Sequence, residues 1–174
     1  MLNKTLLLAT LLFLGGCTLK ENSNLAQLLT KDDIYHMSLQ NTQKAQLMAS
    51  FETKALLTAT YLNPVYSSEN CKNFCMDVED GEYFFIGVYI RDSKSHQFND
   101  KGYSLKLDGK KPEDIEKLDK DDPLRYEMPM VNNWSTYYKV KFPKSAKEEL
   151  TLVFESDRFG KDVLKFSRKG SGLF

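Results

Sequence analysis

The stretch "EYFFIGVYI", residues 82–90, is apolar on both of its alternating faces. The two faces carry Phe84, Ile86, Val88 and Ile90 on one side and Tyr83, Phe85 and Tyr89 on the other. A strand that alternates in this way without a polar face is typically buried on both sides of its sheet. We therefore predict a central strand here, with protein packed against both faces.

Further strands are predicted downstream, where apolar and polar residues alternate. These segments are residues 103–107, 136–142, 150–154 and 163–167, and the last two form a hairpin around the turn residues Asp157 and Gly160. The segment from Pro112 to Leu118 predicts a short helix, since proline is favoured in a first helical turn. Several short strands separated by turns are typical of a β-sandwich.

Upstream of the central strand, the sequence predicts a helix from about residue 31 to residue 62. The apolar stripe has spacings of 4, 4, 4 and 3 and consists of Leu47, Phe51, Ala55, Ala59 and Leu62. Pro64 would end the helix, because proline disfavours helical geometry in the residue before it. A break near Gln40 is left open. The expected fold class is thus mainly β: an immunoglobulin-like β-sandwich with an N-terminal amphipathic α-helix laid across one sheet.

The start of the chain has the layout of a secretory signal: Lys4, an apolar core from Leu6 to Leu14, and small residues before Cys17. The apolar core is too short to span a bilayer, which takes about 20 residues. The residues Leu14-Gly15-Gly16-Cys17 resemble the lipobox of bacterial lipoproteins. A plain signal peptide that ends on a chance cysteine is the alternative.

The lipobox resemblance implies cleavage after Gly16, a diacylglyceryl group on the Cys17 thiol, and acylation of the new amino terminus. Two or three acyl chains would then hold the protein on a bilayer. The residue after the cysteine is Thr18 and not aspartate, which by the same resemblance favours the outer over the inner membrane. In general layout the chain is similar to small envelope lipoproteins, and no motif singles out one family.

The predicted organisation has four parts. They are a signal peptide over residues 1–16, a lipidated N-terminus and tether over 17–29, a helical segment over 30–64, and a β-sandwich over 65–174. The chain has 24 basic and 24 acidic residues. This balance provides no strong field to attract nucleic acid, so we expect a membrane contact through lipid and an envelope protein as partner.

Cys71 and Cys75 form an even pair in a chain predicted to be exported, which indicates a disulfide. A redox pair and half of a metal site are the alternatives. Zinc sites take about four ligands, and His36 and His96 are the only histidines, so no metal is predicted. The acidic segments "MDVEDGEY", with Asp77, Glu79, Asp80 and Glu82, and "KLDKDDP" do not match an EF-hand and are interpreted as solvated turns.

The chain has no G-x-S-x-G, H-E-x-x-H or phosphate-loop motif. We therefore predict a non-enzymatic protein- or ligand-binding module without a cofactor or catalytic residues. A chaperone-like assembly factor for envelope components is one alternative, and a hydrolase with His36 or His96 as its base is another. Trp134 lies close to Tyr137 and Tyr138, and such aromatics either line a groove or fill a core and its rim.

Overall fold

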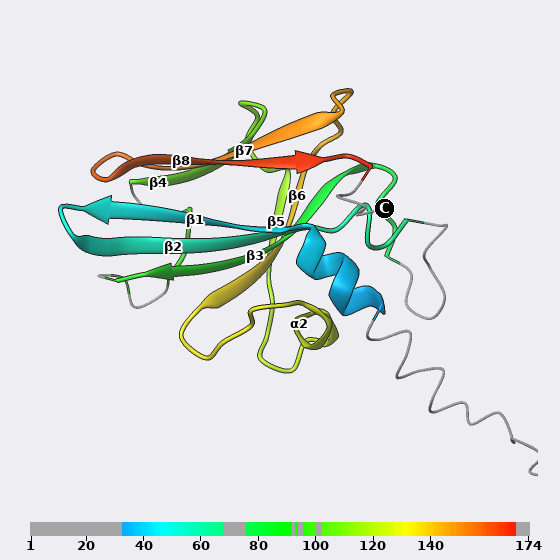
Figure 1. Cartoon of the computed structure of the whole chain (residues 1–174), viewed down its shortest axis with the longest axis horizontal. Helices are drawn as coiled ribbons and strands as arrows, with labels where there is room; N and C mark the ends of the chain where they lie inside the picture. Colours follow the sequence, from blue (N-terminus) through cyan, green and yellow to red (C-terminus); the bar gives the residue numbers. More distant parts are fainter. Residues whose placement is uncertain (1–32, 68–75, 92, 94–95, 100–101, 170–174) are drawn as a thin grey trace, which may run out of the picture.

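The computed structural model describes residues 33–67, 76–91, 93, 96–99 and 102–169. Within them the chain is mainly β and forms two antiparallel sheets (Figure 1). The five-stranded sheet has the order β1 (Thr42–Ala49), β2 (Glu52–Tyr61), β3 (Gly81–Ile90), β6 (Thr136–Pro143) and β5 (Asp114–Lys117). The three-stranded sheet has the order β4 (Tyr103–Leu107), β7 (Glu149–Ser156) and β8 (Gly160–Ser167).

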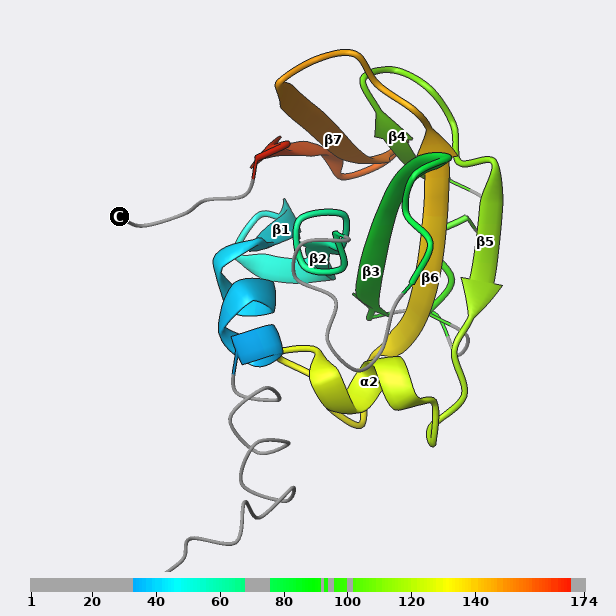
Figure 2. The ribbon, with the colours of Figure 1, turned by 90° about the vertical axis from the view of Figure 1, so that its right-hand side faces the viewer.

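The two sheets pack face to face, in the manner of a β-sandwich (Figure 2). One apolar core lies between them and draws on both sheets, with Phe84 and Ile86 from β3 meeting Leu152 and Phe154 from β7. Side-chain contacts also join the outer strands β1 and β8. The Asp162 carboxylate accepts a hydrogen bond from the backbone N–H of Gln46 at 2.9 Å, so the exposed edges of these two strands are linked.

The prediction that β3 is covered on both faces is confirmed. Phe85 points away from the main core into a second apolar cluster, where its ring stacks on Tyr137 at 5.2 Å between centroids. The short helix α2 (Pro123–Glu127) contributes Leu124 to this cluster, and the helical residues 33–40 pack Ile34 and Met37 against it. The second cluster therefore covers the outer face of the five-stranded sheet.

The predicted helix over residues 31–62 is wrong beyond residue 40, because residues 42–61 form the hairpin of β1 and β2. A spacing of four residues is also two full periods of a strand, so the stripe fits a strand as well as a helix. The strand period is visible in the buried residues Ala45, Leu47, Ala55, Leu57, Ala59 and Tyr61. Phe51 lies in the turn between the strands and is 97% exposed.

The predicted helix from Pro112 to Leu118 is also wrong, since Asp114–Lys117 is strand β5. Ile115 packs against the main core, and the neighbouring residues of the strand are exposed. Helix formation occurs a few residues later. There Asp122 caps α2 by accepting a hydrogen bond from the Leu124 amide at 2.9 Å, and Pro123 occupies the first turn.

The other predicted strands are confirmed as β4, β6, β7 and β8. Leu105 and Leu107, and likewise Leu164 and Phe166, point inward as expected. Tyr137 is the exception: it alternates onto the same face of β6 as Lys139 and Lys141, which predicts exposure to solvent, and yet it is only 1% exposed. The second apolar cluster accounts for this difference.

Candidate functional site

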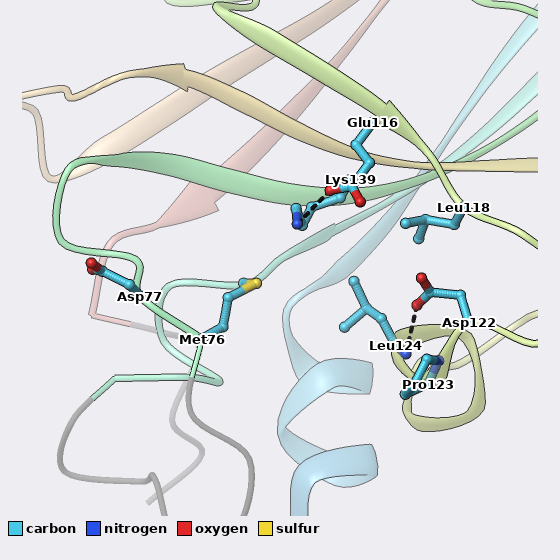
Figure 3. Close-up of a pocket in the computed structure, with 8 residues that line it drawn as sticks. All are labelled: Met76, Asp77, Glu116, Leu118, Asp122, Pro123, Leu124 and Lys139. Carbon is cyan, nitrogen blue, oxygen red and sulfur yellow. Dashed lines mark hydrogen bonds and ion pairs between the residues drawn. The ribbon is translucent and has the colours of Figure 1, made fainter.

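A cleft of about 350 Å³ opens where the outer face of β6, the strand β5 and the start of α2 meet (Figure 3). The segment just before β3 closes it on the remaining side. Its lining consists of Met76, Asp77, Glu116, Leu118, Asp122, Pro123, Leu124 and Lys139. The cleft exists because β5 runs along the sheet edge while the chain that follows it folds back as α2.

The cleft combines an apolar base with a charged rim. Leu118 and Leu124 are each 5% exposed, and both belong to the second apolar cluster. On the rim, the Lys139 ammonium pairs with the Glu116 carboxylate at 2.5 Å. The lining also includes Asp122, whose carboxylate caps α2, and Asp77, whose carboxylate points away from the other lining side chains (Figure 3), so it holds three acids and one base in all. Such a site suits an apolar side chain carried next to a positive charge.

The strand β5 borders this cleft at the edge of its sheet. An edge strand can pair with an extended peptide. Here the Ile115 amide donates a hydrogen bond to the Asp114 carboxylate at 2.9 Å. Because this donor is already engaged, and because β5 has only four residues, the cleft is a better binding feature than the strand edge.

A second surface feature is apolar and lies in the chain after the cleft. We call it the aromatic surface and define it by Tyr126, Met130, Val131 and Trp134. Trp134 and Tyr126 are 64% and 63% exposed. Exposed aromatics of this size are more typical of interaction sites than of a random solvated surface.

Local hydrogen bonds hold the loop that carries Trp134. The Asn132 side-chain oxygen accepts hydrogen bonds from the amides of Trp134 at 3.2 Å and Ser135 at 2.9 Å. The backbone N–H of Asn132 in turn donates a hydrogen bond to the Tyr137 hydroxyl at 2.7 Å. Met130 adopts a φ of 62°, a left-handed conformation that is costly for a side chain of this kind. The loop is therefore fixed in place, with its aromatic ring in solvent.

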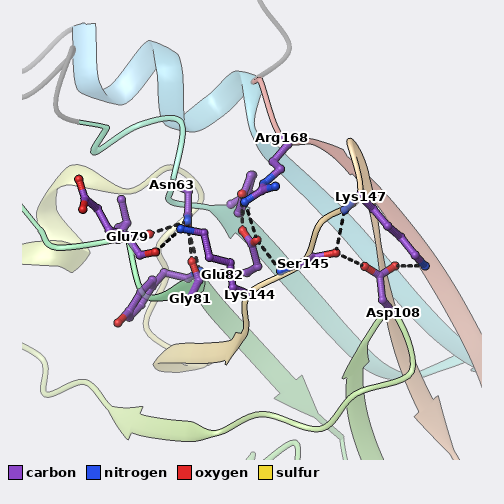
Figure 4. A network of polar contacts seen from close by, with 12 residues as sticks. Asn63, Glu79, Gly81, Glu82, Asp108, Lys144, Ser145, Lys147 and Arg168 are labelled. Atoms are coloured by element: carbon purple, nitrogen blue, oxygen red, sulfur yellow. Dashed lines mark hydrogen bonds and ion pairs between the residues drawn. The ribbon is translucent and has the colours of Figure 1, made fainter.

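A polar network surrounds the buried Glu82 near the start of β3 (Figure 4). This carboxylate is 0% exposed, and it accepts hydrogen bonds from the Tyr61 hydroxyl at 2.6 Å and the Ser145 amide at 2.9 Å. Arg168 pairs with it at 3.4 Å. Burial and the neighbouring Glu82 carboxylate raise the pKa of Tyr61 far above its usual value. The network joins β2, β3 and the ends of β6 and β8, which indicates a structural role.

Asp108 and Asn63 extend the polar network on either side of Glu82. Burial acts to raise the pKa of Asp108, but hydrogen bonds from Lys147, Ser145 and the Thr151 amide outweigh it and lower the pKa. Asn63 donates to the carbonyls of Val78 at 3.0 Å and Gly81 at 2.8 Å. These contacts fix the connections that flank β3 and β7.

The predicted lipidation and cleavage residues, Cys17 and Gly16, and the predicted disulfide residues, Cys71 and Cys75, lie outside the described residues. The lipid anchor and the disulfide therefore stay predictions. In the part of the chain that the structure describes, no three histidine, cysteine or acidic residues are grouped so as to hold a metal ion. Nor does that part contain a helix of sufficient length and apolarity to cross a membrane.

The two histidines are not brought together. His36 is exposed on the helical residues 33–40. The His96 ring lies on Tyr89 at 4.8 Å between centroids, and its Nδ1 is 2.8 Å from the carbonyl oxygen of Ile90 at the end of β3. Neither histidine lines the cleft.

The acidic segment before β3 is solvated at Asp77, Glu79 and Asp80, as expected. The prediction is wrong for Glu82, which is buried with Tyr61 of the adjacent strand β2 and Arg168, just after β8 of the other sheet, against its carboxylate. In the second acidic segment, Asp122 caps a helix that the sequence analysis missed. The Asp-Pro pair at positions 122 and 123 is the pattern that could have revealed it.

The cleft was missed altogether, because its residues come from four separate parts of the sequence. Trp134 was expected to belong most often to a core or its rim, and the structure places it in solvent while Tyr137 and Tyr138 are buried. Compared with models of known protein families, with curated proteins and with solved structures, the chain has no significant match.

Proposed function

We propose that the protein is a lipid-anchored, non-enzymatic binding module of the bacterial envelope, and that its cleft receives a segment of another envelope protein. The lipobox resemblance of residues 14–17 supports the anchor. The single observation that carries the binding role is the cleft itself, with its apolar base and its excess of carboxylates. The partner segment has an apolar side chain next to a lysine or arginine.

The proposal includes an immunoglobulin-like form of the sandwich. The strand order supports it: β2-β3-β6-β5 faces β4-β7-β8. With β1 set aside as an added edge strand, this is the arrangement of strands A, B, E and D opposite C, F and G in a constant-type immunoglobulin domain. Such domains serve many unrelated binding functions, so the fold alone selects no ligand.

The anchor is tested by replacing Cys17 with serine and fractionating the cells. The unmodified chain is expected in the membrane fraction, with an intact mass that includes the diacylglyceryl group. The Cys17→Ser chain is expected to leave the membrane fraction and to lack the mass of the diacylglyceryl group. An equal membrane fraction and the same processed mass for both chains would contradict the lipoprotein part of the proposal.

Binding in the cleft is tested with a photo-crosslinking residue placed at Met76 in living cells. The matched control carries the same residue at Val163, which is 44% exposed on β8, away from the cleft residues. We expect one discrete adduct from position 76 and none of that size from position 163. A ladder of many adducts would instead favour the assembly-factor alternative.

A charge change distinguishes specific binding from simple proximity. Lys139→Glu removes the only base of the lining, and Lys165→Glu makes the same change on an exposed ion pair with Glu149. The Lys139 change adds negative charge next to the bound cation and rearranges Glu116, so it should alter adduct yield, whereas the Lys165 change should not. Equal yields from both variants would remove the cleft from the proposal.

A further inference from the structure

The aromatic surface lies on the same side of the molecule as the start of the described chain. The helical residues 33–40 and α2 are neighbours, since Ile34 and Met37 pack into the cluster that holds Leu124 and Met128. Figures 1 and 2 both place these two helical segments along the lower side of the molecule. The loop that carries Trp134 continues directly from α2.

The helical residues 33–40 add further apolar surface on this side. Tyr35 is 42% exposed and Leu39 is 40% exposed, four residues apart on one helix face. Together with the aromatic surface they provide two tyrosines, a tryptophan and three aliphatic or thioether side chains to solvent. Tryptophan and tyrosine are the residues that favour the boundary between lipid headgroups and acyl chains.

Two of the charges next to this surface, those of Arg125 and Glu127, are engaged within the protein. Arg125 lies over the Tyr137 ring at 4.7 Å and donates a hydrogen bond to the Asp119 carbonyl at 3.0 Å. The Glu127 carboxylate accepts a hydrogen bond from the Tyr66 hydroxyl at 2.5 Å. Insertion of the neighbouring apolar side chains into a bilayer boundary would therefore not require these two charges to lose their partners.

The length of the preceding chain limits how far this side can lie from the proposed anchor. Fifteen residues, 18–32, separate Cys17 from Asp33. Even fully extended, they span at most roughly 55 Å. The proposed anchor thus keeps Asp33 within roughly 55 Å of the bilayer, and Asp33 begins the helical residues on the side that carries the exposed aromatics.

We infer that the aromatic surface docks on the bilayer that holds the anchor, so that the domain has a fixed orientation on the membrane. The inference rests on the proposed lipidation of Cys17, because a single tryptophan loop gives only weak binding without an anchor. Docking orients the open cleft relative to the membrane plane. It depends on apolar insertion and not on charge, since the side chains that define the aromatic surface are all uncharged.

The fluorescence of Trp134 tests this inference directly, because it is the only tryptophan in the chain. The full-length protein is extracted from bacterial membranes and reconstituted into vesicles of phosphatidylcholine and phosphatidylglycerol. Some vesicles carry nitroxide-labelled lipids, with the label either near the headgroup or near the acyl-chain end. Flotation on a density gradient measures vesicle binding separately.

We expect Trp134 emission to shift to shorter wavelength on reconstitution and to be quenched more strongly by the label near the headgroup. This follows because interfacial side chains enter only about 5–10 Å into the headgroup boundary. Raising the salt concentration should leave the quenching unchanged, as apolar insertion is not screened. Met130→Ser combined with Val131→Ser should reduce the quenching, and both residues are exposed enough for the fold to tolerate the change.

The matched control moves the reporter to the β1–β2 turn, as Trp134→Phe combined with Phe51→Trp. Phe51 is 97% exposed at the far end of that hairpin from the helical residues, so its tryptophan should float with the vesicles without being quenched. Equal quenching at both positions would overturn a fixed orientation.

Failure of the anchor and failure of docking give different results. A protein that does not float with vesicles would refute the lipidation on which the inference rests. A protein that floats while Trp134 remains unshifted and unquenched would refute docking and leave the anchor standing. A discrete protein adduct from a photo-crosslinker at position 134, with no quenching in vesicles, would assign the surface to a protein partner instead.

Discussion

Removing the Glu82 carboxylate should be among the most damaging single changes to the stability of this domain. The side chain is 0% exposed and accepts hydrogen bonds from two donors, the Tyr61 hydroxyl at 2.6 Å and the Ser145 amide at 2.9 Å. In Glu82→Ala both donors lose their partner. A buried donor left unsatisfied costs about 1–3 kcal/mol. Arg168, at 32% side-chain exposure, can still reach water, so its lost ion pair adds little.

The expected loss in the free energy of unfolding is therefore about 4 kcal/mol, within the range for breaking a buried charge contact. With a urea dependence of about 2 kcal/mol/M, the unfolding midpoint should fall by about 2 M. Glu82→Gln keeps the shape and can still pair with both groups, one as donor and one as acceptor. Glu82→Gln should therefore lower the free energy of unfolding by about 1–2 kcal/mol, the difference between charged and neutral hydrogen bonds.

Urea unfolding of the chain from Thr18 onward, followed by far-ultraviolet circular dichroism, measures these values. Trp134 is a poor probe here, since it is already 64% exposed in the folded state. Glu155→Gln serves as the control, because its ion pair with Lys106 is solvent-exposed and should change stability by less than about 0.5 kcal/mol.

A second change separates the mechanism from a general packing defect. Tyr61→Phe should destabilise the unmodified protein by about 1.5 kcal/mol or more, as it removes a hydrogen bond to a buried carboxylate. In the Glu82→Ala protein the same change should cost clearly less, because the hydroxyl proton has lost its carboxylate acceptor and only the contact with Arg168 remains. If Tyr61→Phe costs the same in both backgrounds, or if Glu82→Ala behaves like Glu155→Gln, the reasoning about this network is refuted.

Three further predictions concern the sheet, the acid limit and the alkaline limit of stability. Gly87→Ala should destabilise by about 1–3 kcal/mol in the same urea assay, because a Cβ there would lie 2.6 Å from Tyr137; a matched Gly109→Ala change meets no atom within 4 Å and costs only the strain of its positive φ. The pKa of Asp108 is lowered in the folded state. The ionised carboxylate therefore contributes to the free energy of unfolding above the pKa of the unfolded chain, about 3.9, and this contribution is lost as the pH falls through the folded pKa. Asp108→Asn, which tolerates the φ of 49°, should therefore flatten the acid arm of the stability curve. The pKa of Tyr66 is raised by burial and by Glu127. The neutral hydroxyl therefore contributes fully to the free energy of unfolding below about pH 10, and this contribution declines at higher pH. Tyr66→Phe should weaken that decline.

Each of these three has a clear contrary result. A Gly87→Ala protein as stable as the unmodified one would mean that Tyr137 is free to move. An unchanged acid arm in Asp108→Asn would mean that the Lys147, Ser145 and Thr151 contacts do not favour the carboxylate. An unchanged alkaline arm in Tyr66→Phe would place the source of that decline elsewhere.

Local patterns of apolar residues were enough to predict the central strand, the later strands and the mainly β character of the chain. The evidence for them is local. Residues 82–90 are apolar on both alternating faces, and the segments 103–107 and 163–167 each alternate with a period of two. A period of two is a property of the strand alone, so no knowledge of its neighbours is needed to recognise it.

The hairpin of β1 and β2 could not be distinguished from a helix in this way. Its apolar residues recur at spacings that both structures satisfy, and only pairing with β3, where Leu57 lies opposite Val88, selects the strand. Tertiary contact overrides a local ambiguity of this kind, because burial of the shared face in a sheet contributes more than intrinsic propensity does.

The candidate sites were decided by the tertiary structure alone. The cleft combines Met76, Glu116, Leu124 and Lys139, which no spacing in the sequence relates. Glu82 looks like any other acid of its segment until Tyr61 and Arg168 approach it from other strands. Trp134 is exposed because β6 turns its neighbour Tyr137 inward and Asn132 holds the loop outward. Burial and proximity depend on which distant segments meet, and that information is absent from any local window of residues.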